Sequence, residues 1–424
     1  MTRMKESGID WIGQIPEEWE VAKVNHIFEE HKQKNRGNKE KNLLSLSYGR
    51  IIRKSIDSSF GLLPESFDTY NIIQRGDIVL RLTDLQNDKR SLRVGLAREN
   101  GIITSAYLTL RLKNLESNDS YMYYLLHTYD ICKVFYNFGG GVRQGGTWSD
   151  IYKMELLIPP CNEQQKIADF LDKKTAQLDK AKVLLEEQIQ KLKDYRASLI
   201  YETVTKGLDK TVPMKDSGID WIGQIPEGWG VGKVKYFSQI SAGATPDRNN
   251  SLFWNGNINW MSSGEVNQGI VKHTSETITD LALKRTSTKL LPNGTVMLAL
   301  NGQGKTKGTA AVLAIESASN QSLASFIVDN KILNNMYLYY FFVANYYNIR
   351  GLKGEDRDGL NLQLVSNIVI PLFEFEEQQK IVDFLDKKTV QIDKLIQIKN
   401  EQIDNINKQR QTLIYDYVTG KRRV

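Results

Sequence analysis

Cysteine, histidine and long apolar runs are scarce in this chain of 424 residues. Its two cysteines, Cys132 and Cys161, exclude a disulfide framework and a cysteine-rich zinc site. None of its four histidines has a partner at metal-ligand spacing, so we expect no metal centre. The sequence also lacks an apolar run of about 18 residues and begins without the apolar segment of a signal peptide. We therefore expect no membrane segment and a cytoplasmic protein.

The composition is that of a globular protein, with 41% hydrophobic and 25% charged residues. A chain of this length rarely builds one hydrophobic core, so we expect two or more domains. The formal net charge of +6 is a mild bias toward polyanionic partners.

One sequence frame occurs twice. Residues 4–19 read MKESGIDWIGQIPEEW, and residues 214–229 read MKDSGIDWIGQIPEGW. Further along, residues 163–180 (EQQKIADFLDKKTAQLDK) are repeated at 377–394 (EQQKIVDFLDKKTVQIDK). The pattern indicates a tandem duplication of half the chain. Because the segments between these frames diverge, we expect one scaffold with different loops, which suits two different targets read in one act.

Residues 163–206 contain neither proline nor glycine and predict one long helix, with its twin at 377–419. Apolar residues recur there every seven positions, which is typical of a coiled-coil seam. The seam positions are Leu171, Leu178, Leu185, Leu192 and Leu199, and in the second copy Leu385, Ile392, Ile406 and Leu413. A helix of about 40 residues is roughly 60 Å long, longer than one domain. We expect the two helices to pair antiparallel and to act as a ruler between domains.

The diverged segments contain short strand-like runs, among them 102–112 and 323–328, and one helical stretch each, which predicts α+β domains. We expect a first domain at 1–160, a first long helix at 161–207, a linker and second domain at 208–375, and a second long helix at 376–424. The second copy ends shortly after residues 413–421, and the matching residues 199–207 of the first copy lead into the second copy at residue 214. This continuity predicts a pseudo-cyclic arrangement with approximate two-fold symmetry.

Two glycine-rich segments invite an enzymatic interpretation. Residues 299–306 (ALNGQGKT) resemble a phosphate-binding loop, but Ala299 replaces the first glycine and a strand-like run follows. Residues 139–141 could serve a methyl donor, yet the sequence lacks the Pro-Pro-aromatic motif that would hold a target amine. We expect two polar loops, and no catalytic residue in the chain.

Basic and amide side chains gather in the diverged segments and suit contacts with phosphates and base edges. For each of them alone, a solvated surface position is the simpler interpretation. In the first domain the candidates are Arg50, Arg53, Lys54, Lys89, Arg90, Arg93, Arg143 and Gln144. In the second domain they are Arg248, Asn249, Asn250, Asn301, Gln303, Lys305, Lys307, Arg350, Lys353 and Arg357. Trp11 and Trp19, with their repeats Trp221 and Trp229, are expected to anchor an N-terminal arm by packing.

The repeated frames, together with LIYETVTKG at 199–207 and LIYDYVTGK at 413–421, resemble type I restriction-modification specificity subunits over nearly the whole chain. The resemblance implies two target recognition domains joined by two long helices in an antiparallel coiled coil. Each domain would read one half of an asymmetric, bipartite site in double-stranded DNA, and the helices would fix the unread gap.

The resemblance also implies partner subunits that carry the chemistry. Two methylation subunits, holding S-adenosylmethionine, would dock on the chain, and restriction subunits would supply translocation and cleavage driven by ATP and Mg. The chain itself would be a non-catalytic subunit that binds no cofactor. Two alternatives are a self-contained methyltransferase or nuclease, for which the motifs are missing, and a coiled-coil interaction scaffold without sequence-specific DNA binding.

Overall fold

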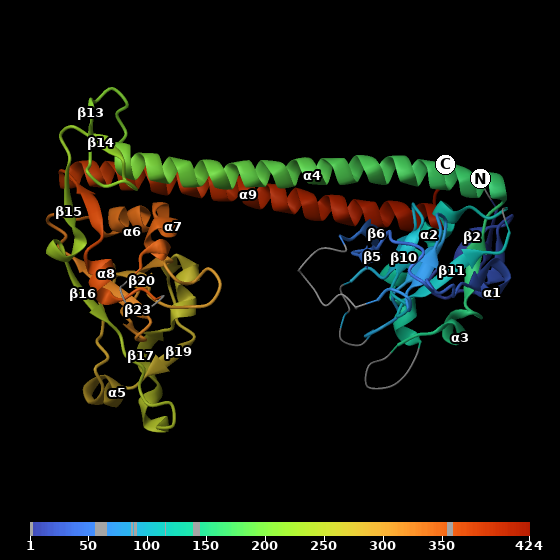
Figure 1. Cartoon of the computed structure of the whole chain (residues 1–424), viewed down its shortest axis with the longest axis horizontal. Coiled ribbons are helices and arrows are strands. Elements are labelled where there is room, and N and C mark those ends of the chain that lie inside the picture. The colour runs from blue at the N-terminus through green and yellow to red at the C-terminus, as the bar shows by residue number, and fades with distance from the viewer. Residues whose placement is uncertain are drawn as a thin grey trace. The chain divides into compact units, whose positions relative to one another are not determined.

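The computed structural model describes residues 3–55, 66–85, 88, 91–114, 116–138, 145–353 and 359–424. The chain forms two compact units, shown in Figure 1. Unit 1 combines Met1–Leu185 with Asn400–Val424, and unit 2 is Glu186–Lys399. Two helices, α4 (Cys161–Lys206) and α9 (Phe375–Val418), pass from one unit into the other. Each unit therefore contains residues from both halves of the repeat.

Unit 1 is built on a four-stranded antiparallel sheet covered by helix α2 (Asp119–Ile131). The strand order is β4 (Phe28–Glu30), β11 (Leu108–Leu112), β8 (Ile78–Leu80) and β9 (Val94–Leu96). Nearly all of α2 is buried, because apolar and tyrosine side chains occupy every face of the helix. Shorter elements complete the unit: β1 (Met4–Glu6) with β2 (Gln14–Pro16), β3 (Glu20–Lys23) with β12 (Glu155–Ile158), α1 (Val24–Ile27), η1 (Val134–Asn137) and α3 (Trp148–Ile151).

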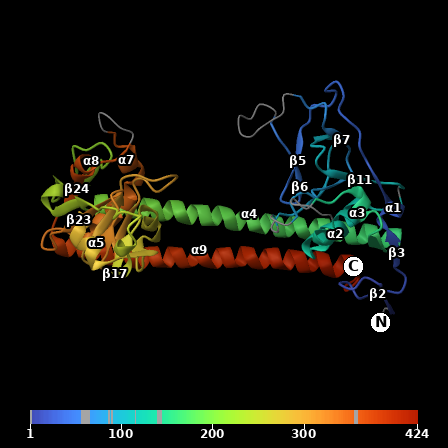
Figure 2. The same ribbon diagram turned by 90° about the horizontal axis from the view of Figure 1, so that it is seen from below.

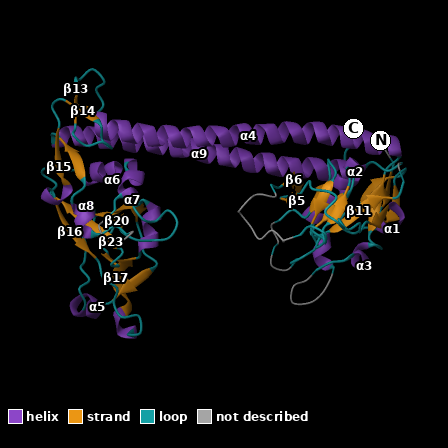
Figure 3. Cartoon of the chain, viewed as in Figure 1, coloured by secondary structure: helices purple, strands orange, loops and turns teal. Residues whose placement is uncertain are grey.

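Unit 2 repeats this scaffold. Its main sheet has the order β16 (Ser238–Ala242), β23 (Leu323–Val328), β20 (Val296–Ala299), β21 (Ala310–Leu313) and β18 (Ile270–Val271), and α6 (Asn335–Ala344) covers it. The outer pairs recur as β13 (Met214–Asp216) with β14 (Gln224–Pro226), and β15 (Gly230–Lys233) with β24 (Val369–Leu372). Helices α7 (Tyr346–Gly351) and α8 (Leu362–Ser366) and the 3-10 turn η2 (Val234–Tyr236) complete it. Both units are thus α+β, as predicted, and Figure 3 shows their mixture of strands and helices.

The units differ in what is inserted into the scaffold. Unit 1 carries the hairpin β5 (Leu44–Ser47)–β6 (Arg50–Arg53) and the pair β7 (Asn71–Ile73)–β10 (Gly101–Ile103). Unit 2 instead carries a three-stranded sheet of β19 (Glu276–Ile278), β17 (Trp254–Met261) and β22 (Ala318–Ser319), with α5 (Asp280–Arg285), η3 (Ser251–Phe253) and η4 (Ser263–Gln268). The expectation of one scaffold with different loops agrees with this arrangement.

The single strand predicted over 102–112 is wrong. The structure has two strands there, β10 ending at Ile103 and β11 beginning at Leu108. A turn separates them, closed by the Tyr107 N–H that donates to the Thr104 carbonyl at 3.3 Å. The two strands then pair with different partners, β7 and β8.

The repeated Gln-Gln pair attaches each domain to its long helix. In unit 1 the Asn118 N–H donates to Gln164 Oε1 at 3.0 Å, and Asn118 Nδ2 donates to Gln165 Oε1 at 2.8 Å. In unit 2, Asn334 makes the same two bonds to Gln378 and Gln379, each at 2.8 Å. The identical motif in both copies therefore has a structural cause.

Two more contacts recur between domain and helix. The Tyr124 hydroxyl donates to Asp172 at 2.7 Å, and the Tyr340 hydroxyl donates to Asp386 at 2.6 Å. The indole of Trp19 donates to Glu163 at 3.0 Å, as that of Trp229 does to Glu377 at 3.3 Å. Both tryptophans are buried, so the expected anchoring of the N-terminal arm is confirmed.

Helices α4 and α9 also contact each other within each unit. In unit 1, Ile414 and Val418 of α9 join the core that contains Ile167 and Leu171 near the start of α4. In unit 2, Ile200 near the end of α4 shares a core with the first turns of α9. The end of one helix thus meets the beginning of the other in both units, which is an antiparallel contact (Figure 2).

The predicted seam side chains face inward. All nine are buried or half-buried. The exposed positions between them are mostly polar or charged, but they include Val183, Leu184, Val390 and Leu395. Lys399, which interrupts the second series, donates to Gln188 at 2.6 Å. Winding of the two helices into one coiled coil stays a prediction, as do the domain limits, although the helices begin and end within a few residues of the expected bounds. None of the helices in the described ranges is long and apolar enough to cross a membrane.

Candidate DNA interface

The β20–β21 loop of unit 2, residues 300–309, presents several of the predicted contact residues. Asn301, Gln303 and Lys305 are exposed, and their side chains make no hydrogen bond or ion pair with any residue that the structure describes. The strand β21 follows this loop where a phosphate-binding loop would need a helix. The segment is therefore a polar loop between strands, as expected.

Four further candidates are Lys307 in this loop and Arg350, Lys353 and Arg357 later in the chain. Arg350 is partly buried and donates to the Lys307 carbonyl at 3.0 Å, so its role is at least partly structural. Lys307 is half-buried and also engaged, whereas Lys353 is exposed. Arg357 lies outside the described residues.

Arg248 lies in the loop before η3 and contacts the inserted sheet of unit 2. Its guanidinium lies 4.1 Å from the ring centre of Trp254 and pairs with Glu276 (Nη2 to Oε2, 3.0 Å). The hydrogen bond from Arg248 lowers the pKa of Glu276, so the carboxylate stays ionised and offsets the arginine charge. Asn249 beside it is exposed, and Asn250 accepts from the Leu252 N–H at 3.1 Å as the cap of η3.

The hairpin of unit 1 carries Arg50, Arg53 and Lys54. Arg50 is paired with Asp179 of α4, and Arg53 donates to both oxygens of Glu99 at 2.9 and 2.7 Å. Both arginines are thus partly neutralised by carboxylates. The exposed Lys54 has no side-chain partner among the described residues and remains the clearest phosphate candidate of this hairpin.

The prediction that Arg93 contacts DNA is wrong. Its side chain is completely buried and donates to the carbonyls of Arg81 at 3.0 Å and Thr83 at 2.7 Å. It also bonds to the Tyr136 hydroxyl at 3.0 Å. A buried guanidinium needs such a set of acceptors, so Arg93 is a structural residue. Lys89, Arg90, Arg143 and Gln144 lie outside the described residues.

Two exposed aromatic side chains were not predicted, because the predicted contacts were limited to basic and amide residues. Tyr48 is 81% exposed at the tip of the β5–β6 hairpin, and Tyr347 is 83% exposed beside the 300–309 loop. Aromatic rings of this kind can stack on nucleobases. The Tyr-Gly pair between the strand-like runs at 44–47 and 50–53 was the available signal for Tyr48 at a hairpin turn.

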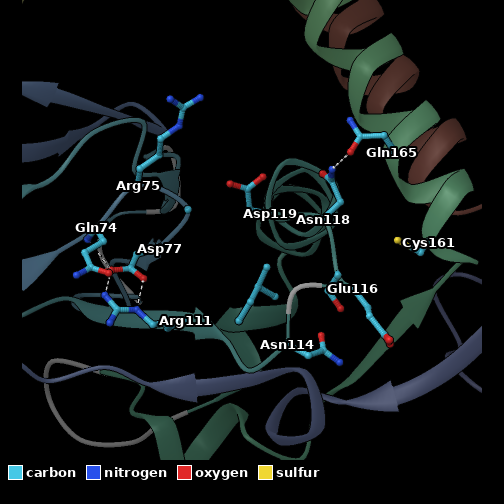
Figure 4. Close-up of a pocket in the computed structure, with 13 residues that line it drawn as sticks. Gln74, Arg75, Asp77, Arg111, Asn114, Glu116, Asn118, Asp119, Cys161 and Gln165 are labelled. Carbon is cyan, nitrogen blue, oxygen red and sulfur yellow. Dashed lines mark hydrogen bonds and ion pairs between the residues drawn. The ribbon is translucent and has the colours of Figure 1, made fainter.

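A cavity of about 400 Å³ lies where the start of α4 meets α2, and Figure 4 shows its lining. Arg111 donates to both oxygens of Asp77 there, at 2.8 and 2.7 Å. Arg75 adds one positive charge to the lining, and Glu116 and Asp119 add two negative charges. This balance of charge suits a polyanion poorly. Among the described residues, no group of three or more His, Cys, Asp or Glu side chains is placed to hold a metal ion.

The family model of the type I restriction modification DNA specificity domain matches residues 16–192 and again 226–408, one match for each copy of the repeat. These two matches cover most of the chain. This chain belongs to the type I restriction-modification DNA specificity family. Membership supports a role in DNA sequence specificity and not the alternative of a scaffold without DNA function.

Individual members of the type I restriction family show the same relationship along the whole chain. The type I restriction enzyme MjaVIII specificity subunit of Methanocaldococcus jannaschii is 25% identical over 97% of this chain and 94% of its own length. A chain solved in work on complex assembly and conformational transition of the type I R-M system has a TM-score of 0.73 at 16% identity, with 95% and 98% of the chains covered. The HsdS subunit from Thermoanaerobacter tengcongensis has a TM-score of 0.54 at 15% identity, with 96% and 98% covered. These structures share the fold of this specificity subunit.

Proposed function

We propose that this specificity subunit reads a bipartite DNA target, with one half-site for each domain, and that α4 and α9 set the gap between the half-sites. The observation that carries the proposal is the combination of identical attachments and different inserts. Both domains are fixed to their helices by the same Asn-Gln, Tyr-Asp and Trp-Glu bonds. Because the attachments are the same and the inserts and loops differ, two domains that read different sequences would be held by the same kind of support.

Phosphate contacts would position each domain on the DNA, and base contacts would select the sequence. Free lysines such as Lys54 and Lys305 would neutralise phosphates, which positions the domain and makes binding depend on salt. Amide side chains such as Gln303 would select base edges in a groove. Two domains that each bind DNA weakly would together bind it more tightly, because binding of the second domain is intramolecular once the first has bound.

We further propose that the chemistry belongs to partner subunits. Methylation subunits would bind S-adenosylmethionine and act on the target, and restriction subunits would use ATP and Mg for translocation and cleavage. The chain would then be a non-catalytic subunit without a cofactor of its own. Purified chain alone should leave DNA unmodified, and the complex with its methylation subunits should methylate one defined sequence.

The gap is tested by lengthening both helices. One heptad is inserted into the 171–199 segment of α4, with a matching heptad in α9 where the helices pair. Seven residues add about 10 Å of helix, close to the length of three base pairs. Methylome sequencing should show both half-sites unchanged and the gap increased by about three base pairs. A control carries the same insertion with its apolar seam positions changed to serine. An unchanged gap in a folded, active variant would contradict the ruler role.

A further inference from the structure

Two residues of α7 hold the 300–309 loop of unit 2 by hydrogen bonds to its backbone; we call these contacts the brace. The Tyr346 hydroxyl donates to the Lys305 carbonyl at 2.9 Å. Arg350 donates to the Lys307 carbonyl at 3.0 Å and to the Tyr346 hydroxyl at 3.1 Å. Gly308, at φ +84°, packs so closely that an added Cβ would lie 3.1 Å from Arg350 Cβ. The loop backbone is therefore fixed, although Asn301, Gln303 and Lys305 point outward unpartnered within the described chain.

Unit 1 braces the topologically equivalent β8–β9 connection by the same chemistry. Arg93 donates to loop carbonyls, including that of Thr83 at 2.7 Å, and to the Tyr136 hydroxyl at 3.0 Å. The Tyr136 hydroxyl in turn donates to the Asp88 carbonyl at 3.2 Å. In both units an arginine and a tyrosine thus bond to each other and to the carbonyls of this connection.

Both units have this Arg-Tyr brace, but the arginine comes from a different part of the chain in each unit. Tyr136 and Tyr346 both follow the helix that covers the sheet, α2 or α6. The arginines, however, come from different places: Arg93 immediately precedes β9, whereas Arg350 lies in α7. Apart from Leu82 and Leu300, which follow β8 and β20 at equivalent positions, the two loops have no sequence pattern in common. A rigid backbone with interchangeable outward side chains is what a base-reading loop requires, since discrimination depends on exact placement of donors and acceptors.

We propose that the 300–309 loop is the base-reading element of the second domain. Asn301 and Gln303 would contact base edges, preferentially adenine, to which an amide offers a matched donor and acceptor. Lys305 would contact a phosphate, and Tyr346 and Arg350 are positioning residues that hold the loop. This inference rests on the proposed function, because it assigns residues to the reading of one half-site.

The reading role is tested with the complex of the full chain and its methylation subunits. Methylation rates are compared on the cognate duplex and on duplexes with single base changes in either half-site. Gln303→Ala and Asn301→Ala should each reduce discrimination at one position of the second half-site by about tenfold, with the first half-site unaffected. Lys305→Ala should weaken binding evenly on all sequences and reduce the salt slope by about 0.9.

The brace is tested by removing one hydroxyl. Tyr346→Phe keeps the ring but removes the bonds to Lys305 and Arg350, so discrimination across the second half-site should fall. The matched control is Tyr236→Phe, because Tyr236 is 69% exposed in the same unit and its hydroxyl makes no hydrogen bond to described residues. Tyr136→Phe should act on the first half-site alone. Circular dichroism melting of each variant verifies that the domains remain folded.

The results distinguish failure of the loop assignment from failure of the proposed function. Unchanged discrimination in Gln303→Ala, Asn301→Ala and Tyr346→Phe would overturn the assignment of this loop, while the bipartite function would stand. Equal losses from Tyr346→Phe and Tyr236→Phe would overturn the positioning role. A wild-type complex that methylates DNA without sequence preference would instead refute the proposed function itself.

Discussion

His127 makes the stability of unit 1 depend on pH. It lies in α2 among buried side chains, and neither ring nitrogen has a hydrogen-bond partner in the described chain. Burial, with a smaller contribution from the positive charge of Arg410 on α9, lowers the pKa of His127 to about 3, from an ordinary value of 6.5. Tyr123, one turn earlier, has its ring centre 5.8 Å away. The imidazole is therefore neutral in the folded protein well below neutral pH.

The sign and size of the effect follow from proton linkage. Between pH 6.5 and pH 3 the unfolded chain binds a proton at His127 that the folded chain does not bind. Unfolding then takes up a proton, so the free energy of unfolding falls as the pH falls through this window. The free energy of unfolding falls by about 1.4 kcal/mol for each pH unit, which is a loss of roughly 2 kcal/mol between pH 6.5 and pH 5.

The perturbation is His127→Val, because Val343 occupies the corresponding position in α6 of unit 2. Urea unfolding of the wild type and the variant is measured at pH 7.5 and pH 5.0. The cavity left by the smaller side chain costs the same at both values and cancels in the comparison. We expect the wild type to lose about 2 kcal/mol more than the variant on acidification. Identical pH dependence in the two proteins would refute the neutral, buried state of this histidine.

Three other predictions concern the junctions of the chain. Tyr337→Phe removes hydroxyl bonds to the Val204 and Pro371 carbonyls and should cost about 1–2 kcal/mol by thermal melting, while the exposed Tyr236→Phe should cost nothing measurable. Joining residue 424 to residue 1 and opening the chain within 206–214 should leave the circular dichroism spectrum and cooperative melting intact; loss of folded protein would contradict the pseudo-cyclic arrangement. Exchange of residues 20–160 for another domain of the family should alter only one half-site in the methylome, and changes in both half-sites would show that the domains do not read independently.

The parts of the fold that could be predicted are those whose signal is local or repeated. An unbroken helical period predicts α4 and α9, because helix formation depends on neighbours three and four positions apart. Arg93 could not be assigned from sequence, because its burial depends on carbonyls that the loop brings together only after folding. The prediction of one strand over 102–112 failed for a similar reason. The turn at Thr104–Tyr107 arises because β10 pairs with β7 and β11 pairs with β8, which local propensity does not determine.

The repeated contacts explain how such a chain can exchange one reader for another. Tyr121 in unit 1 donates to the Val418 carbonyl at 3.3 Å, and Tyr337 in unit 2 donates to the Val204 carbonyl at 2.9 Å. Each acceptor belongs to the helix from the other half of the repeat, so neither half completes its unit alone. Since each helix offers the same glutamines, carboxylates and carbonyls, it cannot distinguish which domain is attached. A new domain therefore needs to preserve these attachment residues and the apolar side chains that pack on both helices, whereas its inserts and the outward side chains of the braced loop can differ.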